Sequence, residues 1–107
     1  MICRLWRGWT ANHNADAYET YLRDELFPTL RRELTAHGYR GHHVLRLQRD
    51  DETEFVTMVW FTSIDAVRSF AGDSFELPVI SDKASKLLSR HAERCDHYDL
   101  RATDSIS

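Results

Sequence analysis

The sequence EFVTMVWFTSIDAVRSFAG, residues 54–72, predicts one strand followed directly by one short helix. Its first part, residues 55–61, is apolar on both faces of a strand, and only Thr57 interrupts the pattern. A strand with one solvated face would alternate apolar with polar side chains, so both faces of this strand need cover. In a chain of 107 residues, we expect its own helices to cover one face and a second copy of the chain to cover the other.

Length and composition favour a single domain over residues 1–107. With 42% hydrophobic and 29% charged residues, the chain has enough apolar mass to bury a core without disulfides or metal. The net charge of −3, with both signs interspersed, does not form the Lys and Arg clusters of a nucleic-acid-binding surface. No apolar run approaches the ~18 residues of a membrane span, and the N-terminus lacks a signal-peptide layout. We therefore expect a cytoplasmic protein with no nucleic-acid or membrane partner.

The chain as a whole predicts an α+β fold with the element order β-α-β-β-α-β, the ferredoxin-like arrangement of a four-stranded antiparallel sheet. We expect strands over residues 2–10, 42–49, 53–62 and 93–101. A long helix should follow the first strand, and shorter helices should begin at Ser63 and at Ser81, the latter running to about His91. Residues 102–107 should form a flexible tail.

Local signals mark the ends of these helices. Asp16 and Glu19 match a capping box at the start of the long helix, with Asn14 as the alternative cap. Pro28 lies within its apolar stripe, and because proline lacks an amide proton we expect a kink or a break there. Gly38 is placed to end the helix.

The chain resembles the antibiotic biosynthesis monooxygenase superfamily, whose members form dimeric α+β barrels. The resemblance runs from the first predicted strand to the last. It is carried by Trp6-Arg7-Gly8-Trp9-Thr10, Ala15-Asp16-Ala17-Tyr18-Glu19, Gly38-Tyr39-Arg40-Gly41, Phe61-Thr62-Ser63-Ile64-Asp65-Ala66, Phe70-Ala71-Gly72 and His97-Tyr98. It implies a homodimer in which two sheets pack face to face, with Met58 and Trp60 toward the second sheet. It also implies a pocket between each sheet and its helices.

The residues that carry the two studied activities of that superfamily are absent. The pattern Trp-Glu-Ser at the end of the third strand is Phe-Thr-Ser at residues 61–63, and Trp60 stands one position early, on the opposite face. Cofactor-free monooxygenases also have an Asn and a Tyr at the positions of Thr57 and Val67. The positions that correspond to the catalytic residues of haem-degrading members are near Trp6, Phe70 and Ile80.

The two-residue period of a strand places Thr57, Val59 and Phe61 on one face, which the resemblance directs toward the helices. If the apolar faces of the second and third strands match, His43 and Leu45 join them. The predicted pocket residues are Trp6, His43, Leu45, Thr57, Val59, Phe61, Val67, Phe70 and Tyr98. A slip of one residue in the strand registers would replace Trp6 by Leu5 and His43 by His42.

Two histidines are candidate catalytic residues. His43 in the predicted pocket and His97 on the last strand could each act as an acid or base near neutral pH. His42 and His43 are adjacent on a strand and point to opposite faces, so they cannot chelate one metal together. We expect no metal and no organic cofactor.

Two classes of function follow. The first is a cofactor-independent monooxygenase, or a related enzyme, acting on a hydrophobic aromatic small molecule, and the resemblance favours it. The second is a non-catalytic dimer that binds a small ligand or serves as an accessory subunit, and the absent catalytic residues favour it.

Overall fold

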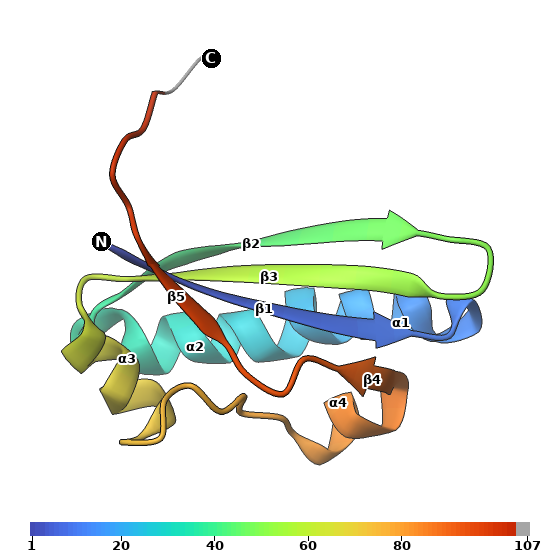
Figure 1. Cartoon of the computed structure of the whole chain (residues 1–107). Coiled ribbons are helices and arrows are strands. Elements are labelled where there is room, and N and C mark those ends of the chain that lie inside the picture. The colour runs from blue at the N-terminus through green and yellow to red at the C-terminus, as the bar shows by residue number, and fades with distance from the viewer. Residues whose placement is uncertain (105–107) are drawn as a thin grey trace.

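The computed structural model describes residues 1–104 and has an α+β fold, with an open sheet and helices packed on one of its faces (Figure 1). The strands are β1 (Ile2–Thr10), β2 (Tyr39–Gln48), β3 (Thr53–Phe61), β4 (Leu88–His91) and β5 (Asp96–Asp99). The helices are α1 (Ala15–Tyr21), α2 (Phe27–Leu34), α3 (Ile64–Ala71) and α4 (Asp82–Leu87).

The sheet has the strand order β2-β3-β1, and both β4 and β5 pair with β1 along its other edge. All of these pairs are antiparallel, with β4 beside residues 8–10 and β5 beside residues 2–5 of β1. The prediction of a single last strand over residues 93–101 is therefore wrong. The sheet has five strands, because two short strands share the edge of β1.

The helix predicted to reach His91 ends at Leu87, and the chain turns directly into β4. Gly8 provides the physical reason, because a Cβ atom there would lie 2.9 Å from Cδ2 of Leu88. The bare backbone of Gly8 thus leaves room for Leu88 to lie against β1. Between the two strands the amide of Ala92 donates to the carbonyl of Arg7 at 2.8 Å, which holds the connection on the same edge.

The long helix is continuous rather than broken at Pro28. A π-helical turn over Leu22–Leu26 joins α1 to α2, and Pro28 lies in the first turn of α2. The amide of Phe27 donates to the carbonyl of Leu22, five residues back. This wider turn accommodates Pro28, which has no amide proton to donate. The capping box does not form, since Asp16 and Glu19 pair instead with Arg46 of β2, and Asn14 makes no side-chain cap.

The other predicted ends are confirmed. The chain passes through Gly38 with φ of 105°, and a Cβ atom there would lie 2.5 Å from that of Ala66, so both backbone conformation and space require glycine. Ser63 accepts from the amide of Ala66, and Ser81 accepts from the amide of Ala84, each at 3.1 Å. These hydrogen bonds start α3 and α4.

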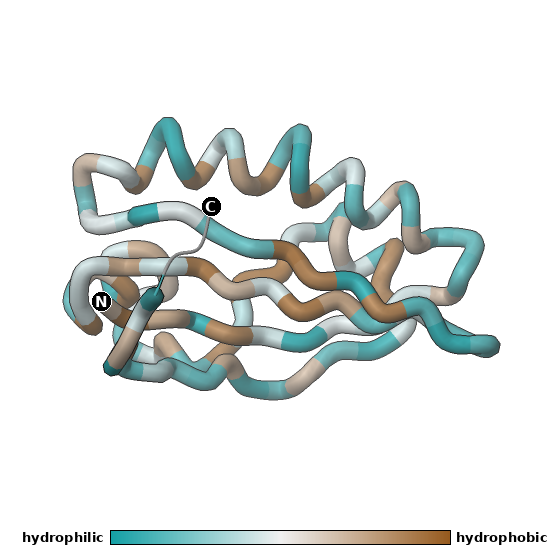
Figure 2. The backbone as a smooth tube through the Cα atoms, turned by 90° about the horizontal axis from the view of Figure 1, so that it is seen from above, coloured by the Kyte–Doolittle hydropathy of each residue, from teal (hydrophilic) through white to brown (hydrophobic). Residues whose placement is uncertain are grey.

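The two faces of the sheet differ in cover. The side chains of β3 that point toward the helices are Thr53, Phe55, Thr57, Val59 and Phe61, each at most 8% exposed. The alternate side chains, Glu54, Val56, Met58 and Trp60, are half-buried on the side that no helix covers. We call these sides the helix face and the open face. Figure 2, seen from above, shows hydrophobic residues recurring along the central strands.

Residues 100–104 follow β5 without helix or strand and extend away from the sheet on the side opposite the helices (Figure 1). The predicted flexible tail covers residues 102–107, of which 105–107 lie outside the described residues. No helix within residues 1–104 is both long enough and apolar enough to cross a membrane.

Candidate functional site

A cavity of about 60 Å³ lies between the helix face of the sheet and the helical layer. Four lining residues come from the sheet, six from the helical segment and seven from the chain after α3 begins. They are Arg4, Trp6, Thr57 and Val59; Tyr18, Tyr21, Leu22, Leu26, Phe27 and Leu30; and Phe70, Pro78, Val79, Ile80, Ser81, Ala84 and Cys95. The wall is mostly apolar, and within the described part of the chain Arg4 is its one charged member.

The cavity has room for a few water molecules, each of which needs about 10–15 Å³. Typical small-molecule sites are larger, on the order of 300 Å³ or more, so an aromatic ligand needs part of the wall to move outward. Residues 78–81 are the part of the wall with neither helix nor strand, and Val79 is 57% exposed. This segment is therefore the wall that moves at the lowest cost.

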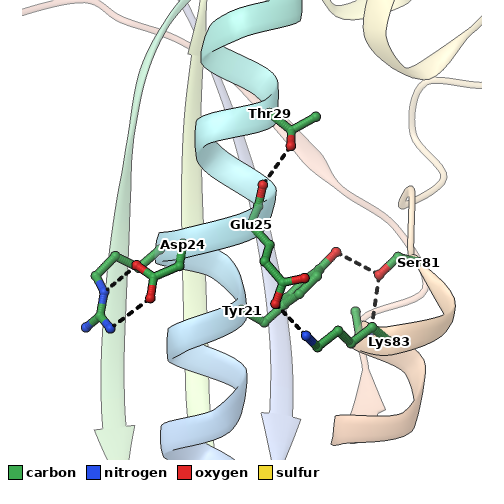
Figure 3. Close-up of polar contacts among 8 residues, drawn as sticks. Tyr21, Asp24, Glu25, Thr29, Ser81 and Lys83 are labelled. Atoms are coloured by element: carbon green, nitrogen blue, oxygen red, sulfur yellow. Dashed lines mark hydrogen bonds and ion pairs between the residues drawn. The ribbon is translucent and has the colours of Figure 1, made fainter.

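Two contacts tie this segment and α4 to the helical segment (Figure 3). The hydroxyl groups of Tyr21 and Ser81 share a hydrogen bond of 2.7 Å. Lys83 of α4 forms an ion pair with Glu25, and its ammonium group lies 5.9 Å from the centre of the Tyr21 ring. The ion pair is exposed and contributes about 0–1 kcal/mol, so these contacts leave the wall able to open.

Arg4 carries a buried positive charge into the cavity wall. Its side chain donates to the carbonyls of Phe75 and Leu77 and to Nε2 of His97, the last at 3.0 Å, and its guanidinium lies 5.5 Å from the centre of the Phe70 ring. The residue is only 5% exposed, and within residues 1–104 no carboxylate pairs with it. Burial lowers the pKa of Arg4, but an arginine remains cationic at neutral pH.

His97 lies beside Arg4 and does not line the cavity. Because a guanidinium has only donors, Nε2 of His97 accepts from Arg4 and the ring proton is on Nδ1. Burial lowers the pKa of His97 below 6.5, and the charge of Arg4 lowers it further, so the ring is neutral at pH 7. Its basic nitrogen is thus occupied by Arg4.

Four of the nine predicted pocket residues line the cavity: Trp6, Thr57, Val59 and Phe70. Phe61 and Val67 are fully buried and belong to the core behind the cavity rather than to its wall. Trp6 is held in place because its indole Nε1 donates to the carbonyl of Ala92 at 2.9 Å.

The predicted pocket positions of His43, Leu45 and Tyr98 are wrong. His43 pairs with Met58, Leu45 with Val56 and Tyr98 with Cys3, which places all three on the open face. Leu45 and Tyr98 are 50% and 54% exposed, and His43 accepts a hydrogen bond of 3.0 Å from Nε1 of Trp60. His43 therefore cannot act as an acid or base on a molecule bound in this cavity.

The strand register explains the error. The prediction matched the apolar Leu45 with the helix face, whereas the sheet pairs Val44 with Thr57 and His42 with Val59. An irregularity between Tyr39 and His42, where Gly41 has φ of 119°, sets this register. The apolar side chains of β2 at positions 45 and 47 thus belong to the open face.

His42 takes the place on the helix face, but it is also outside the cavity wall. Its ring stacks on Phe27 with centroids 3.8 Å apart, and the Tyr39 hydroxyl shares a hydrogen bond of 2.6 Å with Nδ1. Burial lowers the pKa of His42, and the nearby charges of Arg31 and His43 lower it further. Across residues 1–104, no histidine lines the cavity, and no three His, Cys, Asp or Glu side chains form a metal-binding group.

Sequence reasoning missed Arg4 and the segment of residues 78–81. A signal for Arg4 was present, because the two-residue period places it on the same face of β1 as Trp6. Residues 78–81 have no periodicity that would indicate their position. Tyr18 and Tyr21 are buried in the core, and they also form part of the cavity wall.

No family model matches the chain, and no curated protein matches it significantly. The two sheet faces and the cavity are therefore the features that point to a function.

Proposed function

We propose that this protein is a homodimer of the ferredoxin-like, dimeric α+β barrel type that binds a hydrophobic, aromatic small molecule in a cavity of each subunit. The division of the sheet into two apolar faces carries this proposal. The helix face encloses a cavity with a mostly apolar wall, and no helix of residues 1–104 covers the open face.

The composition of the open face supports a dimer. Its apolar side chains are Leu5, Trp9, Leu45, Leu47, Val56, Met58, Trp60 and Tyr98. Charged groups gather at the end of the sheet nearest the β2–β3 turn, where Glu54 meets Arg7 and Arg49, and Glu52 meets Arg90. An apolar surface with a charged rim is typical of a protein interface. A second copy offers the same surface and closes the assembly by twofold symmetry.

The geometry favours ligand binding over catalysis. Of the two predicted catalytic histidines, His43 lies on the open face, and His97 bonds to Arg4 and does not line the cavity. General acid–base catalysis needs a titrating group within hydrogen-bond reach of the substrate, and no histidine of residues 1–104 lines the cavity in this state.

Cofactor-independent oxygenation is the second candidate, and the contact between Arg4 and neutral His97 favours it. An activated methylene group would lose a proton to His97 once Arg4 releases Nε2, and the positive charge of Arg4 would stabilise the resulting anion. The anion would reduce molecular oxygen and form a C–O bond, and His97 would return the proton to the peroxide. Loss of water then leaves a carbonyl, so one methylene and one O₂ give one carbonyl and one water.

Three measurements test these proposals. Sedimentation velocity at micromolar concentration should give a dimer, and a well-folded monomer would contradict the proposed assembly. Titration with small aromatic compounds should shift the indole resonance of Trp6, which lines the cavity. Oxygen uptake with a panel of phenols and enolisable aromatic ketones separates the two classes. Oxygen uptake that is lost in His97→Gln would establish the oxygenase. If a compound binds and no oxygen is taken up, the protein is a binding protein for that compound.

A further inference from the structure

The hydrogen bonds of Arg4 leave part of its guanidinium without a partner. A guanidinium has five N–H donors. Both donors of Nη1 are used, by the carbonyl of Phe75 and by His97, and one donor of Nη2 is used by the carbonyl of Leu77. The Nε–H and the second donor of Nη2 have no partner within residues 1–104.

The structural contacts of Arg4 do not neutralise its charge. Two carbonyls, a neutral imidazole and the face of Phe70 each offer partial negative charge, whereas a buried cation is normally paired with a carboxylate. Arg4 holds the segment after α3 against the sheet through Phe75 and Leu77. A neutral donor could hold those carbonyls without the cost of burying a charge, so the charge itself calls for a different explanation.

The remainder of the cavity wall defines the rest of the ligand. Arg4 is the only charged residue among those that line the cavity. Phe27, Val59 and Phe70 supply apolar surface nearby, and the hydroxyl groups in the wall include those of Thr57 and Ser81. Such a site suits a molecule with one negative group at one end and an apolar body.

We propose that the ligand of this cavity is an organic monocarboxylate with an aromatic or alicyclic body, bound through its carboxylate to Arg4. The two unpartnered donors on one guanidinium match the two oxygens of a carboxylate, which arginine binds in a bidentate manner. This inference rests on the proposed binding function and names the chemical class of its ligand.

The first test uses the unmodified protein and pairs of ligands that differ only in charge. Benzoate is compared with benzamide, and 1-naphthoate with 1-naphthamide, by calorimetry at pH 7. A charge-assisted hydrogen bond to a buried guanidinium should make each acid bind about tenfold or more tightly than its amide. The Nε–H resonance of Arg4 should shift on addition of the acid and not of the amide.

Variants of two arginines on the same strand provide the matched control. Arg4→Gln should reduce the ratio of acid to amide affinity to about one, while the affinity for the amide stays within about threefold. Arg7→Gln, on the open face of β1, should keep the preference of the unmodified protein. If Arg4→Gln does not fold, the affinities of the ligand pairs and the Nε–H resonance, both measured on the unmodified protein, decide whether Arg4 binds a carboxylate.

The outcomes separate this inference from the function on which it rests. Tighter binding of the acids that depends on Arg4 supports both. Equal affinity for acid and amide, or an Arg4 Nε–H resonance that the acid leaves unchanged, overturns the carboxylate inference and leaves the binding function standing. Failure of every member of both pairs to bind overturns both.

Discussion

The two faces of this sheet are built from similar apolar residues but differ in how far the chain's own helices bury them. On β3, Phe61 on the helix face is fully buried by the chain's own helices, whereas its neighbour Trp60 on the open face keeps part of its ring exposed. Burial of the helix face supplies much of the folding energy of the chain. The open face keeps hydrophobic surface that the helices of residues 1–104 do not cover. Continuous hydrophobicity along a strand can therefore serve folding on one face and, in the dimer proposed above, association on the other.

The same contrast holds for two arginines on β1. The Arg7 side chain on the open face is 47% exposed, and its guanidinium lies 3.6 Å from the carboxylate of Glu54. Arg4 on the helix face is buried and has no carboxylate partner among residues 1–104. A paired, solvated arginine needs no further explanation. A buried arginine without a carboxylate partner among residues 1–104, beside a cavity, is the feature on which the proposed ligand site rests.

The largest expected effect is on the helix face. Phe61→Ala should lower the free energy of unfolding by about 3–5 kcal/mol, because it leaves a cavity between Tyr39 and Phe70, whose rings contact Phe61. Urea denaturation followed by circular dichroism measures the change. The matched variant on the open face, Leu45→Ala, should cost less than about 1 kcal/mol per subunit. If Leu45→Ala lowered the free energy of unfolding as much as Phe61→Ala, the two faces would not differ in their contribution to folding.

The next effect separates association from folding. Trp60→Glu places a charge at the centre of the open face, so the proposed dimer should weaken by about 2 kcal/mol or more, roughly a 30-fold rise in its dissociation constant. Sedimentation equilibrium measures this change, and circular dichroism should show that the subunit stays folded. Thr20→Glu, on the exposed surface of α1, is the control and should leave association unchanged. Unaltered association of Trp60→Glu would place the interface elsewhere.

The sequence alone was sufficient for features that depend on a few neighbouring residues. The caps at Ser63 and Ser81, the end at Gly38 and the division of the β3 side chains between two faces follow from local spacing. Features that depend on pairing between distant segments were not predictable in this way. The hydrophobicity of Leu45 is equally compatible with either face, and the irregularity at Gly41 decides between them.

The candidate site shows the same limit. Arg4 and His97 are 93 positions apart, and they meet because β5 pairs with β1 in one particular register. Neither residue type nor spacing indicates that contact. By contrast, the two-residue period placed Thr57 and Val59 on the correct face, and Trp6 was also predicted in the pocket. Three of the four residues that the sheet contributes to the cavity wall were therefore predicted.

A smaller effect tests the movable wall of the cavity. Ser81→Ala removes the cap of α4 and the hydrogen bond to Tyr21, and should cost about 1 kcal/mol of stability. Ser63→Ala removes a cap of the same kind from α3, away from the cavity, and should cost a similar amount. Ligand exchange, measured by stopped-flow fluorescence with 1-naphthoate, should accelerate in Ser81→Ala and not in Ser63→Ala. Equal exchange rates in the two variants would show that residues 78–81 are not the entrance.

The smallest effect concerns histidine titration on the helix face. Burial lowers the pKa of His42 and of His97 in the folded state below the ordinary value of 6.5. Between the folded and unfolded pKa values the unfolded chain binds more protons, so stability is full above about pH 6.5 and declines as pH falls below it. Urea midpoints measured from pH 7.5 to pH 5 should therefore decrease toward acid. His42→Gln and His97→Gln should each flatten this profile, and the double variant should have the flattest. If the urea midpoint of the double variant fell with pH as steeply as that of the unmodified protein, groups other than these two histidines would cause the acid sensitivity. Burial of His42 and His97 would then not distinguish the helix face from the open face.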